Sequence, residues 1–365
     1  MKKRKILNGY VPLTFVVAIL FFVLTLIAYL YAINDPKIAD IFNDSLGTVF
    51  RFALARLTGW LPFSFFELLL ILILPLCVIF VIYLVRKRRG LKERIQSILS
   101  LLSLISLILV SYVFTLGVGY RTTPLSEKIG IEDVKNIGSE ELFSVTDLLI
   151  SEVNSLAQNL ELKNGETVMP YTLSELCDLL SISFDRVNKA YGIPDSFDGG
   201  VKPVLFSTVM SDAGITGIYS FFTGEANVNI EYPHYTLPFT AAHEMAHQRG
   251  IARENEANFI AFLVCISSDD EYVRYSGYLG MLEYFLSAAY TTDRDGYPEL
   301  YSTISPIAIS DIRAAIAVTN AHKDSLIGKI NDRLNDRYLK FNGTEGVVTY
   351  GYAVRLTVGY YRNDK

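Results

Sequence analysis

Cysteine and histidine are scarce in this chain, whose 365 residues include only three cysteines and four histidines. The cysteines, Cys77, Cys177 and Cys265, lie far apart, so the sequence has no C-x-x-C pair. This spacing excludes a zinc site built from paired cysteines and a thioredoxin-like redox motif. Cys177 and Cys265 could pair in an oxidising compartment, but both lie in apolar, helix-like stretches, which favours two buried free thiols.

Charged residues make up only 19% of the chain, and three long segments contain almost none. These segments cover residues 11–33, 65–85 and 95–118. Each is about as long as a helix that crosses a hydrocarbon core of about 30 Å. The first is longer than the apolar core of a signal peptide and lacks a small-x-small cleavage site, so we expect an uncleaved anchor. The sequence therefore predicts three transmembrane helices.

Basic residues flank these segments in a pattern that predicts their orientation. Residues 2–5 are basic and precede the first segment, and a basic cluster over residues 86–94 lies between the second and the third. Because basic loops stay in the cytoplasm, both clusters are expected there. We therefore predict a multi-pass protein of the cell membrane with a cytoplasmic N-terminus. Residues 1–118 would form the membrane domain, and residues 119–365 an extracytoplasmic domain.

The expected extracytoplasmic domain is acidic. Residues 119–365 contain 20 basic and 33 acidic residues, whereas residues 1–118 contain 13 basic and 5 acidic ones. Nucleic acid is therefore not an expected partner, since binding a duplex requires a basic surface that displaces counterions. Between the first two spans, residues 38–58 show apolar residues at helical spacing. They fit either a helix on the outer leaflet or a short packed helix that joins the spans.

Helical patterns predominate after the third span. Short strands are expected over residues 204–210, 217–222 and 224–230. Helices are expected over residues 139–162, 172–191, 237–248, 253–265, 271–290 and 311–337, and residues 346–361 fit either a strand pair or a helix. The fold class predicted from this pattern is α+β, with three N-terminal transmembrane helices followed by a mostly helical domain with a small sheet.

One short motif carries most of the chemical information. His243-Glu244-Met245-Ala246-His247 is an H-E-x-x-H sequence within a predicted helix. Histidines four residues apart project from one face of a helix, so both imidazoles can bind one Zn2+ ion. Glu244 can then reach water at that ion as the general base. Zn2+ is therefore the expected cofactor, His243 and His247 the expected ligands, and Glu244 the expected catalytic residue.

A catalytic zinc site needs a third protein ligand, and two glutamates follow the motif. Glu254 and Glu256 are two residues apart, so they point to different faces of a helix and cannot both face one ion. Glu254 shares its face with small or polar residues, which would allow close approach to the histidine helix, whereas Glu256 shares its face with core-like residues. We favour Glu254. Asn258, one turn later, either supports a ligand histidine by hydrogen bonding or is an ordinary polar helix residue.

These motifs resemble those of known proteins. H-E-x-x-H followed by E-x-x-A-N resembles the gluzincin metallopeptidases, and the resemblance implies a zincin-like fold with Glu254 as third ligand and Glu244 as general base and acid. Asn258 stands where those families often have Asp, and only six residues separate His247 from Glu254, fewer than in most gluzincins. The segments FTGEANVN, HEMAHQRGIARENEANFIAF and YLKFNGTEGVVTYGYAVRL also resemble a bacterial membrane family of unknown function.

The expected function is hydrolysis of peptide bonds outside the cytoplasm by a membrane-anchored zinc metallopeptidase. Its partners would be the lipid bilayer and a peptide or protein substrate. The strand over residues 224–230, with Glu225, Ala226 and Asn227, either pairs with the substrate as an edge strand or is an internal strand. His234, His322, Tyr232, Tyr235 and Tyr350 are all open as oxyanion donors.

Two other functions compete with this expectation. A non-catalytic zinc-binding receptor or sensor would keep a structural ion, although such a site has no need of Glu244. An intramembrane protease would carry the motif inside a span, but the flanks of the motif are too polar for that. A fourth protein ligand would favour the receptor, and an open coordination position would favour the enzyme.

Overall fold

The computed structural model describes residues 11–86, 90–193, 199–342 and 350–363. The chain is mostly helical with a small sheet, and it divides into two compact units. The first unit comprises Met1–Thr122 together with Ser220–Gly224, and the second comprises Thr123–Tyr219 and Glu225–Lys365.

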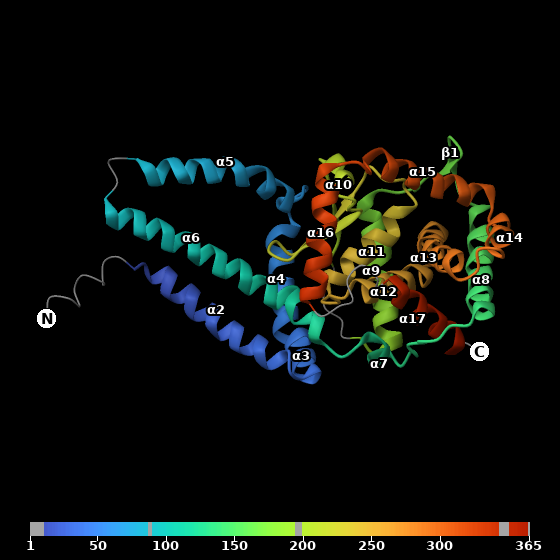
Figure 1. Ribbon diagram of the computed structural model, residues 1–365, viewed down its shortest axis with the longest axis horizontal. Helices are drawn as coiled ribbons and strands as arrows, with labels where there is room; N and C mark the ends of the chain where they lie inside the picture. The colour runs from blue at the N-terminus through green and yellow to red at the C-terminus, as the bar shows by residue number, and fades with distance from the viewer. Residues whose placement is uncertain (1–10, 87–89, 194–198, 343–349, 364–365) are drawn as a thin grey trace. The chain divides into compact units, whose positions relative to one another are not determined.

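The first unit contains the long apolar helices (Figure 1). Its elements are α2 (Leu13–Ala32), α3 (Pro36–Phe42), a π-helical turn (Asn43–Gly47), α4 (Thr48–Gly59), α5 (Phe65–Val85), α6 (Leu91–Tyr112), a second π-helical turn (Val113–Gly117) and a short 3-10 turn (Gly119–Arg121). Within the described residues, three helices are long and apolar enough to cross a membrane, namely α2, α5 and the helix that starts with α6. They are compatible with a membrane protein. The basic residues 2–5 and 87–89 lie outside the described residues, so the orientation stays a prediction.

The segment between the first two long helices is helical, as predicted for residues 38–58. The Asp35 side chain caps α3 by accepting a hydrogen bond from the backbone N–H of Lys37. The Ser64 side chain caps α5 by accepting one from the backbone N–H of Glu67. Arg51 of α4 is fully buried, and its guanidinium donates to the carbonyl and side-chain oxygens of Asn43. The placement of residues 38–58 on the outer leaflet stays a prediction.

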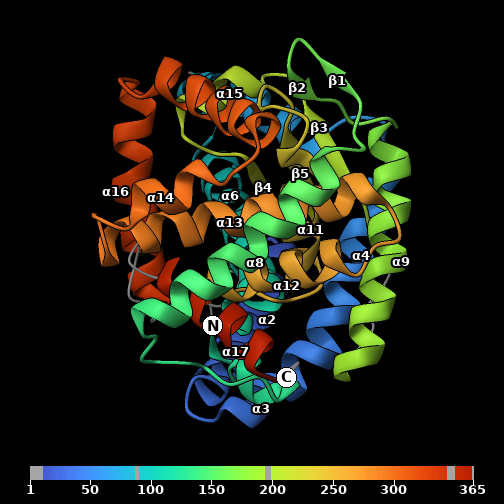
Figure 2. The same ribbon diagram turned by 90° about the vertical axis from the view of Figure 1, so that its right-hand side faces the viewer.

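The second unit is built around a helical core. Its helices are α7 (Leu125–Ile129), α8 (Ser139–Ala157), α9 (Leu173–Tyr191), α10 (Ser207–Asp212), α11 (Thr236–Gln248), α12 (Glu254–Ile266), α13 (Glu271–Thr292), α14 (Tyr297–Ser302), α15 (Pro306–His322), α16 (Leu326–Phe341) and α17 (Tyr350–Asn363). Helix α13 packs against α8, α11 and α12 (Figures 1 and 2). Helix α9 begins with a capping box, in which the side chains of Thr172 and Glu175 each accept a hydrogen bond from the other's backbone N–H. Cys177 and Cys265 are free, as predicted.

The sheet of this part of the chain has three strands, β3 (Val201–Val204), β4 (Gly217–Ser220) and β5 (Glu225–Asn229), in the order β3-β5-β4. A separate hairpin pairs β1 (Leu162–Lys163) with β2 (Glu166–Thr167). Strand β3 runs parallel to β5, with Val201 opposite Ala226. Every residue of β5 is buried, and β5 packs against α11.

Two predictions about these elements were wrong, and one that was left open is decided. The strand expected over residues 204–210 is instead the end of β3 followed by helix α10, in which Ser207, Met210 and Ser211 are buried at helical spacing. The single helix expected over residues 311–337 is interrupted between α15 and α16, where Ser325 accepts a hydrogen bond from the backbone of Ile327. Of the two alternatives for residues 346–361, the structure shows the helix, over Tyr350–Asn363, while residues 346–349 lie outside the described residues.

Of the two alternatives for the strand over residues 224–230, the structure shows the internal strand and not the edge strand, because β5 is the middle strand. Asn227 and Asn229, which alternate with apolar residues along β5, are buried, and the side-chain Nδ2 of each is hydrogen-bonded internally. Asn227 Nδ2 donates to the carbonyl of Ile218, and Asn229 Nδ2 donates to the carbonyl of Ile215. Glu225, Ala226 and Asn227 therefore offer no free backbone edge to a substrate.

Candidate metal centre

Helix α11 places the two motif histidines side by side. Ala241, Ala242, Met245 and Ala246 are fully buried and fix the helix in the core. The rings of His243 and His247 project from one face, with centroids 4.6 Å apart and Nε2 atoms 3.0 Å apart. The four-residue spacing therefore does what the sequence predicted: it directs two imidazole nitrogens to one point.

The turn after α11 fixes the orientation of His247. Gly250 has φ +94°, a left-handed conformation that glycine adopts without strain, and it ends the helix where the sequence predicted. The chain then reverses, and the backbone N–H of Ile251 donates to the carbonyl of Ala246 over 3.1 Å. The carbonyl of Ile251 accepts a hydrogen bond of 2.7 Å from His247 Nδ1. This bond places a proton on Nδ1 and directs Nε2 toward Glu254.

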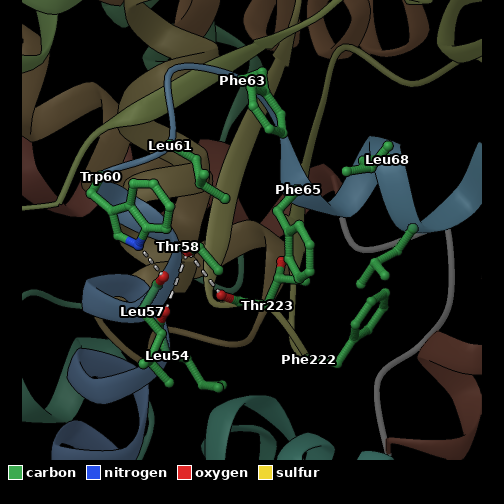
Figure 3. A pocket seen from close by; sticks show the side chains of 11 residues that line it. Leu54, Leu57, Thr58, Trp60, Leu61, Phe63, Phe65, Leu68, Phe222 and Thr223 are labelled. Carbon is green, nitrogen blue, oxygen red and sulfur yellow. Dashed lines mark hydrogen bonds between the residues drawn. The ribbon is translucent and has the colours of Figure 1, made fainter.

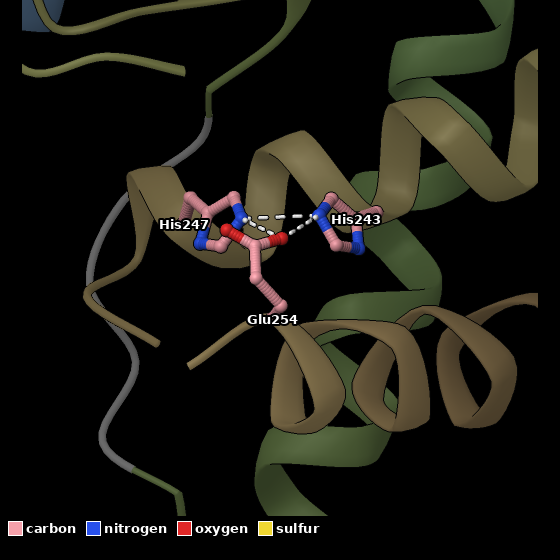
Figure 4. Close-up of side chains that lie close together, drawn as sticks. All are labelled: His243, His247 and Glu254. Atoms are coloured by element: carbon pink, nitrogen blue, oxygen red, sulfur yellow. Dashed lines mark hydrogen bonds and ion pairs between the residues drawn. The ribbon is translucent and has the colours of Figure 1, made fainter. Parts of the chain in front are cut away.

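Glu254, at the first position of α12, completes the group. Its Oε2 lies 3.2 Å from His243 Nε2 and 3.5 Å from His247 Nε2 (Figure 4). One ligand atom of each side chain lies within 4.8 Å of the other two. Tetrahedral zinc with bonds of about 2.0–2.1 Å needs ligand atoms about 3.3 Å apart, so the spacing of these three atoms fits the ion.

Glu256 has a structural role instead. Its Oε1 accepts a 2.9 Å hydrogen bond from the backbone N–H of Leu125 and pairs with Arg253 Nη1, also at 2.9 Å. The Glu256 side chain is buried, whereas the Glu254 side chain keeps 41% of its exposure. The preference for Glu254 over Glu256 as the residue facing the histidines therefore agrees with the geometry.

Charge also binds this group together in the metal-free protein. Burial lowers the pKa of His247, but the nearby Glu254 carboxylate outweighs it, and the pKa is raised to about 9. Burial acts in the opposite direction on Glu254, yet the facing histidines hold the pKa of its carboxyl well below the usual range. A protonated His247 can thus donate from Nε2 to Glu254 at the point where the three ligand atoms converge.

Glu244 lies on a different face of α11 from the two histidines and packs against strand β4. It is buried, and burial raises its pKa despite the opposing effect of His243 and His247. The backbone of Tyr219 donates a hydrogen bond to the carboxylate, while Oε2 has no hydrogen-bond partner among the described residues. A Cβ on Gly217 would stand 2.6 Å from Oε1, so β4 approaches Glu244 this closely only because residue 217 is glycine.

The other predicted residues lie elsewhere. Asn258 is buried on α12, but His247 Nδ1 is bonded to Ile251, and His243 Nδ1 has no hydrogen-bond partner in the described part of the chain. The hydrogen bond from a ligand histidine to Asn258 is therefore not formed. Most of the polar groups considered as oxyanion donors have other partners: His234 with Met169, His322 with Asp212, Tyr232 with Thr319 and Tyr235 with Glu283. The side chain of Tyr350 lies outside the described residues.

Comparison with known proteins assigns a family but no activity. The fold and site define a mostly helical protein with three candidate membrane helices and a His-His-Glu group able to hold a metal ion. A family model described as "Protein of unknown function (DUF3810)" matches residues 42–358, so the chain belongs to that family. No curated protein and no solved structure matches it.

The ligand set can be tested by comparing two neighbouring glutamates. Glu254→Gln should weaken zinc binding by roughly 100-fold or more, because it removes one of three anchoring atoms. Glu256→Gln, on the same turn of α12, should leave zinc affinity unchanged. The measurement is a competition titration of the purified full-length protein against a chromophoric chelator. Equal affinities in the two variants would contradict the assignment.

The pKa of His247 predicts how zinc binding depends on protons. Zinc requires neutral imidazole, so a histidine with a pKa of about 9 must lose its proton when the metal binds at pH 7. We expect about one proton or more to be released for each zinc ion bound at pH 7. A single histidine with the reference histidine pKa would release only about a quarter of a proton. Calorimetry in buffers of different ionisation enthalpy measures this number. A release below half a proton would show that His247 is not charged in the metal-free protein.

Proposed function

We propose that this protein is a membrane-anchored, zinc-dependent metallopeptidase that hydrolyses peptide bonds outside the cytoplasm. The observation that carries the proposal is the convergence of His243, His247 and Glu254 beside a buried Glu244. A zincin-like arrangement of the second unit, with its motif helix next to a small sheet, is part of the same proposal. The extracytoplasmic position follows from the basic clusters of the sequence and is proposed with it.

The composition of the site favours catalysis over a structural metal. Within the described residues, the group contains three side chains of the kinds that bind metal, and a structural zinc site usually has four. Glu254 keeps 41% of its side-chain exposure, so the group is accessible to solvent from its side. A receptor with a structural ion would also have no use for the carboxylate of Glu244, which is costly to bury.

Glu244 is suited to act as the proton carrier. A bound zinc ion would lower the pKa of a water molecule toward about 7 and polarise the substrate carbonyl. Glu244 would accept the proton of that water and later deliver it to the leaving amine. Burial raises the pKa of Glu244, which brings the carboxylate closer to the range in which it can both accept and return a proton.

Strand β4 is the better candidate for pairing with substrate. It is an outer strand of the three-stranded sheet, and its residues Gly217 and Tyr219 contact Glu244 or lie directly beside it. An extended peptide that pairs with an outer strand is held by backbone hydrogen bonds and so needs little sequence specificity. A peptide aligned along β4 would pass close to the proton carrier.

Glu244→Gln tests the proposed role of Glu244. The amide keeps the size of the side chain but cannot accept a proton, so hydrolysis should fall by about 100- to 10,000-fold while zinc content is unchanged. Glu271→Gln, an exposed position at the start of α13, is the matched control and should retain full activity. Rates are measured on a mixed-sequence peptide library with mass-spectrometric detection. Full activity of Glu244→Gln would eliminate the mechanism.

Gly217→Ala tests the close approach of β4 to Glu244. The new Cβ would lie 2.6 Å from Glu244 Oε1 and 2.8 Å from Thr240 Cγ2, so the strand or the carboxylate has to move. We expect at least a roughly tenfold loss of hydrolysis, with unchanged zinc content, since small displacements of catalytic groups are costly. Gly138→Ala, which meets no atom within 4 Å, should be neutral. Equal activities of the two variants would remove β4 from the site.

A further inference from the structure

The first unit contains an apolar cavity of about 480 Å³ (Figure 3). Its walls come from α4, from the start of α5 and from the segment Ser220–Gly224, and they include Leu57, Trp60, Leu61, Phe65 and Phe222. Ligand-binding pockets usually measure about 300–1,000 Å³. The cavity is therefore large enough for a small ligand or one chain of a larger one.

The chemistry of the walls selects a hydrocarbon. Among the residues that the structure describes, no charged side chain lines the cavity. The hydroxyl of Thr58 donates to the carbonyl of Thr223 over 3.2 Å, and Trp60 Nε1 donates to the carbonyl of Leu57 over 2.8 Å. These two donors are thus bonded within the protein, and the Thr223 hydroxyl is the one polar side-chain group of the described lining residues that is buried without a hydrogen-bond partner. An extended peptide would bury most of its own amides against such a wall without partners, which is unfavourable.

Hydrogen bonds and ring packing fix the segment Ser220–Gly224, which forms one wall of the cavity. Ser111 and Thr115 donate through their hydroxyls to the carbonyl of Phe221, over 2.7 Å and 3.2 Å. Phe222, the next residue, packs on Phe66 of α5 with ring centroids 5.7 Å apart. The wall is therefore fixed on both sides, and a ligand would not have to order it on binding.

The cavity is continuous with the surface of a candidate membrane span. Phe65 and Leu68 belong to the first turn of α5, whose most apolar window has a mean hydropathy of 3.3 and no buried residues. Trp60 lies at the junction and is 77% exposed. Tryptophan is enriched where hydrocarbon meets headgroups, so the cavity is expected at the depth where acyl chains begin.

We propose that this cavity binds one acyl chain of a bilayer phospholipid. Arg56 provides the reason for choosing a phospholipid over a neutral lipid. It is an exposed cation on α4, one helical turn before Trp60 and on the same face, where it can approach a phosphate. The acyl chain contacts Leu57, Leu61 and Phe222. This site is independent of the proposed peptidase activity.

The test is photo-crosslinking in nanodiscs that contain the full-length protein and a phosphatidylglycerol with a diazirine near the end of one acyl chain. Crosslinked peptides are mapped by mass spectrometry. We expect labelling concentrated in residues 54–69 and 220–224. Leu61→Trp, which fills the cavity, should reduce that labelling at least fivefold. Leu74→Trp, on the exposed surface of α5, should leave it unchanged.

Two further arms separate the proposal from alternatives. Leu57→Trp fills the cavity from an exposed position, so its loss of labelling cannot be attributed to misfolding if its melting temperature is unchanged. A diacylglycerol probe should label the same peptides less than phosphatidylglycerol, and Arg56→Gln should abolish the difference. Labelling spread evenly over α2, α5 and α6 would mean only bulk lipid contact and would overturn the proposal. Labelling by an acylated peptide but not by phosphatidylglycerol would also overturn it.

Discussion

The contact between the Glu254 carboxylate and the two histidines of α11 is the constraint on which the proposed chemistry depends. It joins two helices that are separated by only a few residues, so the chain between them must reverse sharply. Gly250 permits that reversal through its positive φ, and the same turn presents the carbonyl of Ile251 to His247. A side chain at residue 250 would strain the turn and, with it, both the orientation of one ligand and the position of another.

The parts of the site that follow a helical period could be predicted from the sequence. Four-residue spacing directs His243 and His247 to one face, and the two-residue offset between Glu254 and Glu256 separates a carboxylate that faces the histidines from a structural one. The carbonyl of Ile251 could not be predicted in the same way, because a backbone group has no signature of its own. Gly250 is the signal in the sequence for this turn, because a glycine that follows a helix commonly adopts a positive φ.

Sheet position could not be decided from the sequence, since it depends on partners distant in the sequence. Asn227 and Asn229 alternate with apolar residues as on a half-buried strand, yet both are buried, and the carbonyls of Ile218 and Ile215 accept hydrogen bonds from their Nδ2 groups. This places β5 in the middle and leaves β4 beside Glu244. The apolar cavity is a similar case, because Phe222 follows α4 by more than 160 residues and no local pattern joins them.

The account depends most directly on the coordination of zinc by these three side chains, which X-ray absorption at the zinc edge measures. For the full-length protein loaded with one equivalent of zinc, it predicts two imidazole nitrogens, one carboxylate oxygen and one solvent oxygen, with bonds of about 2.0–2.1 Å. One imidazole should disappear from the spectrum of His243→Ala. A shell that contains sulfur, has four protein ligands or is unaltered in His243→Ala would contradict the account.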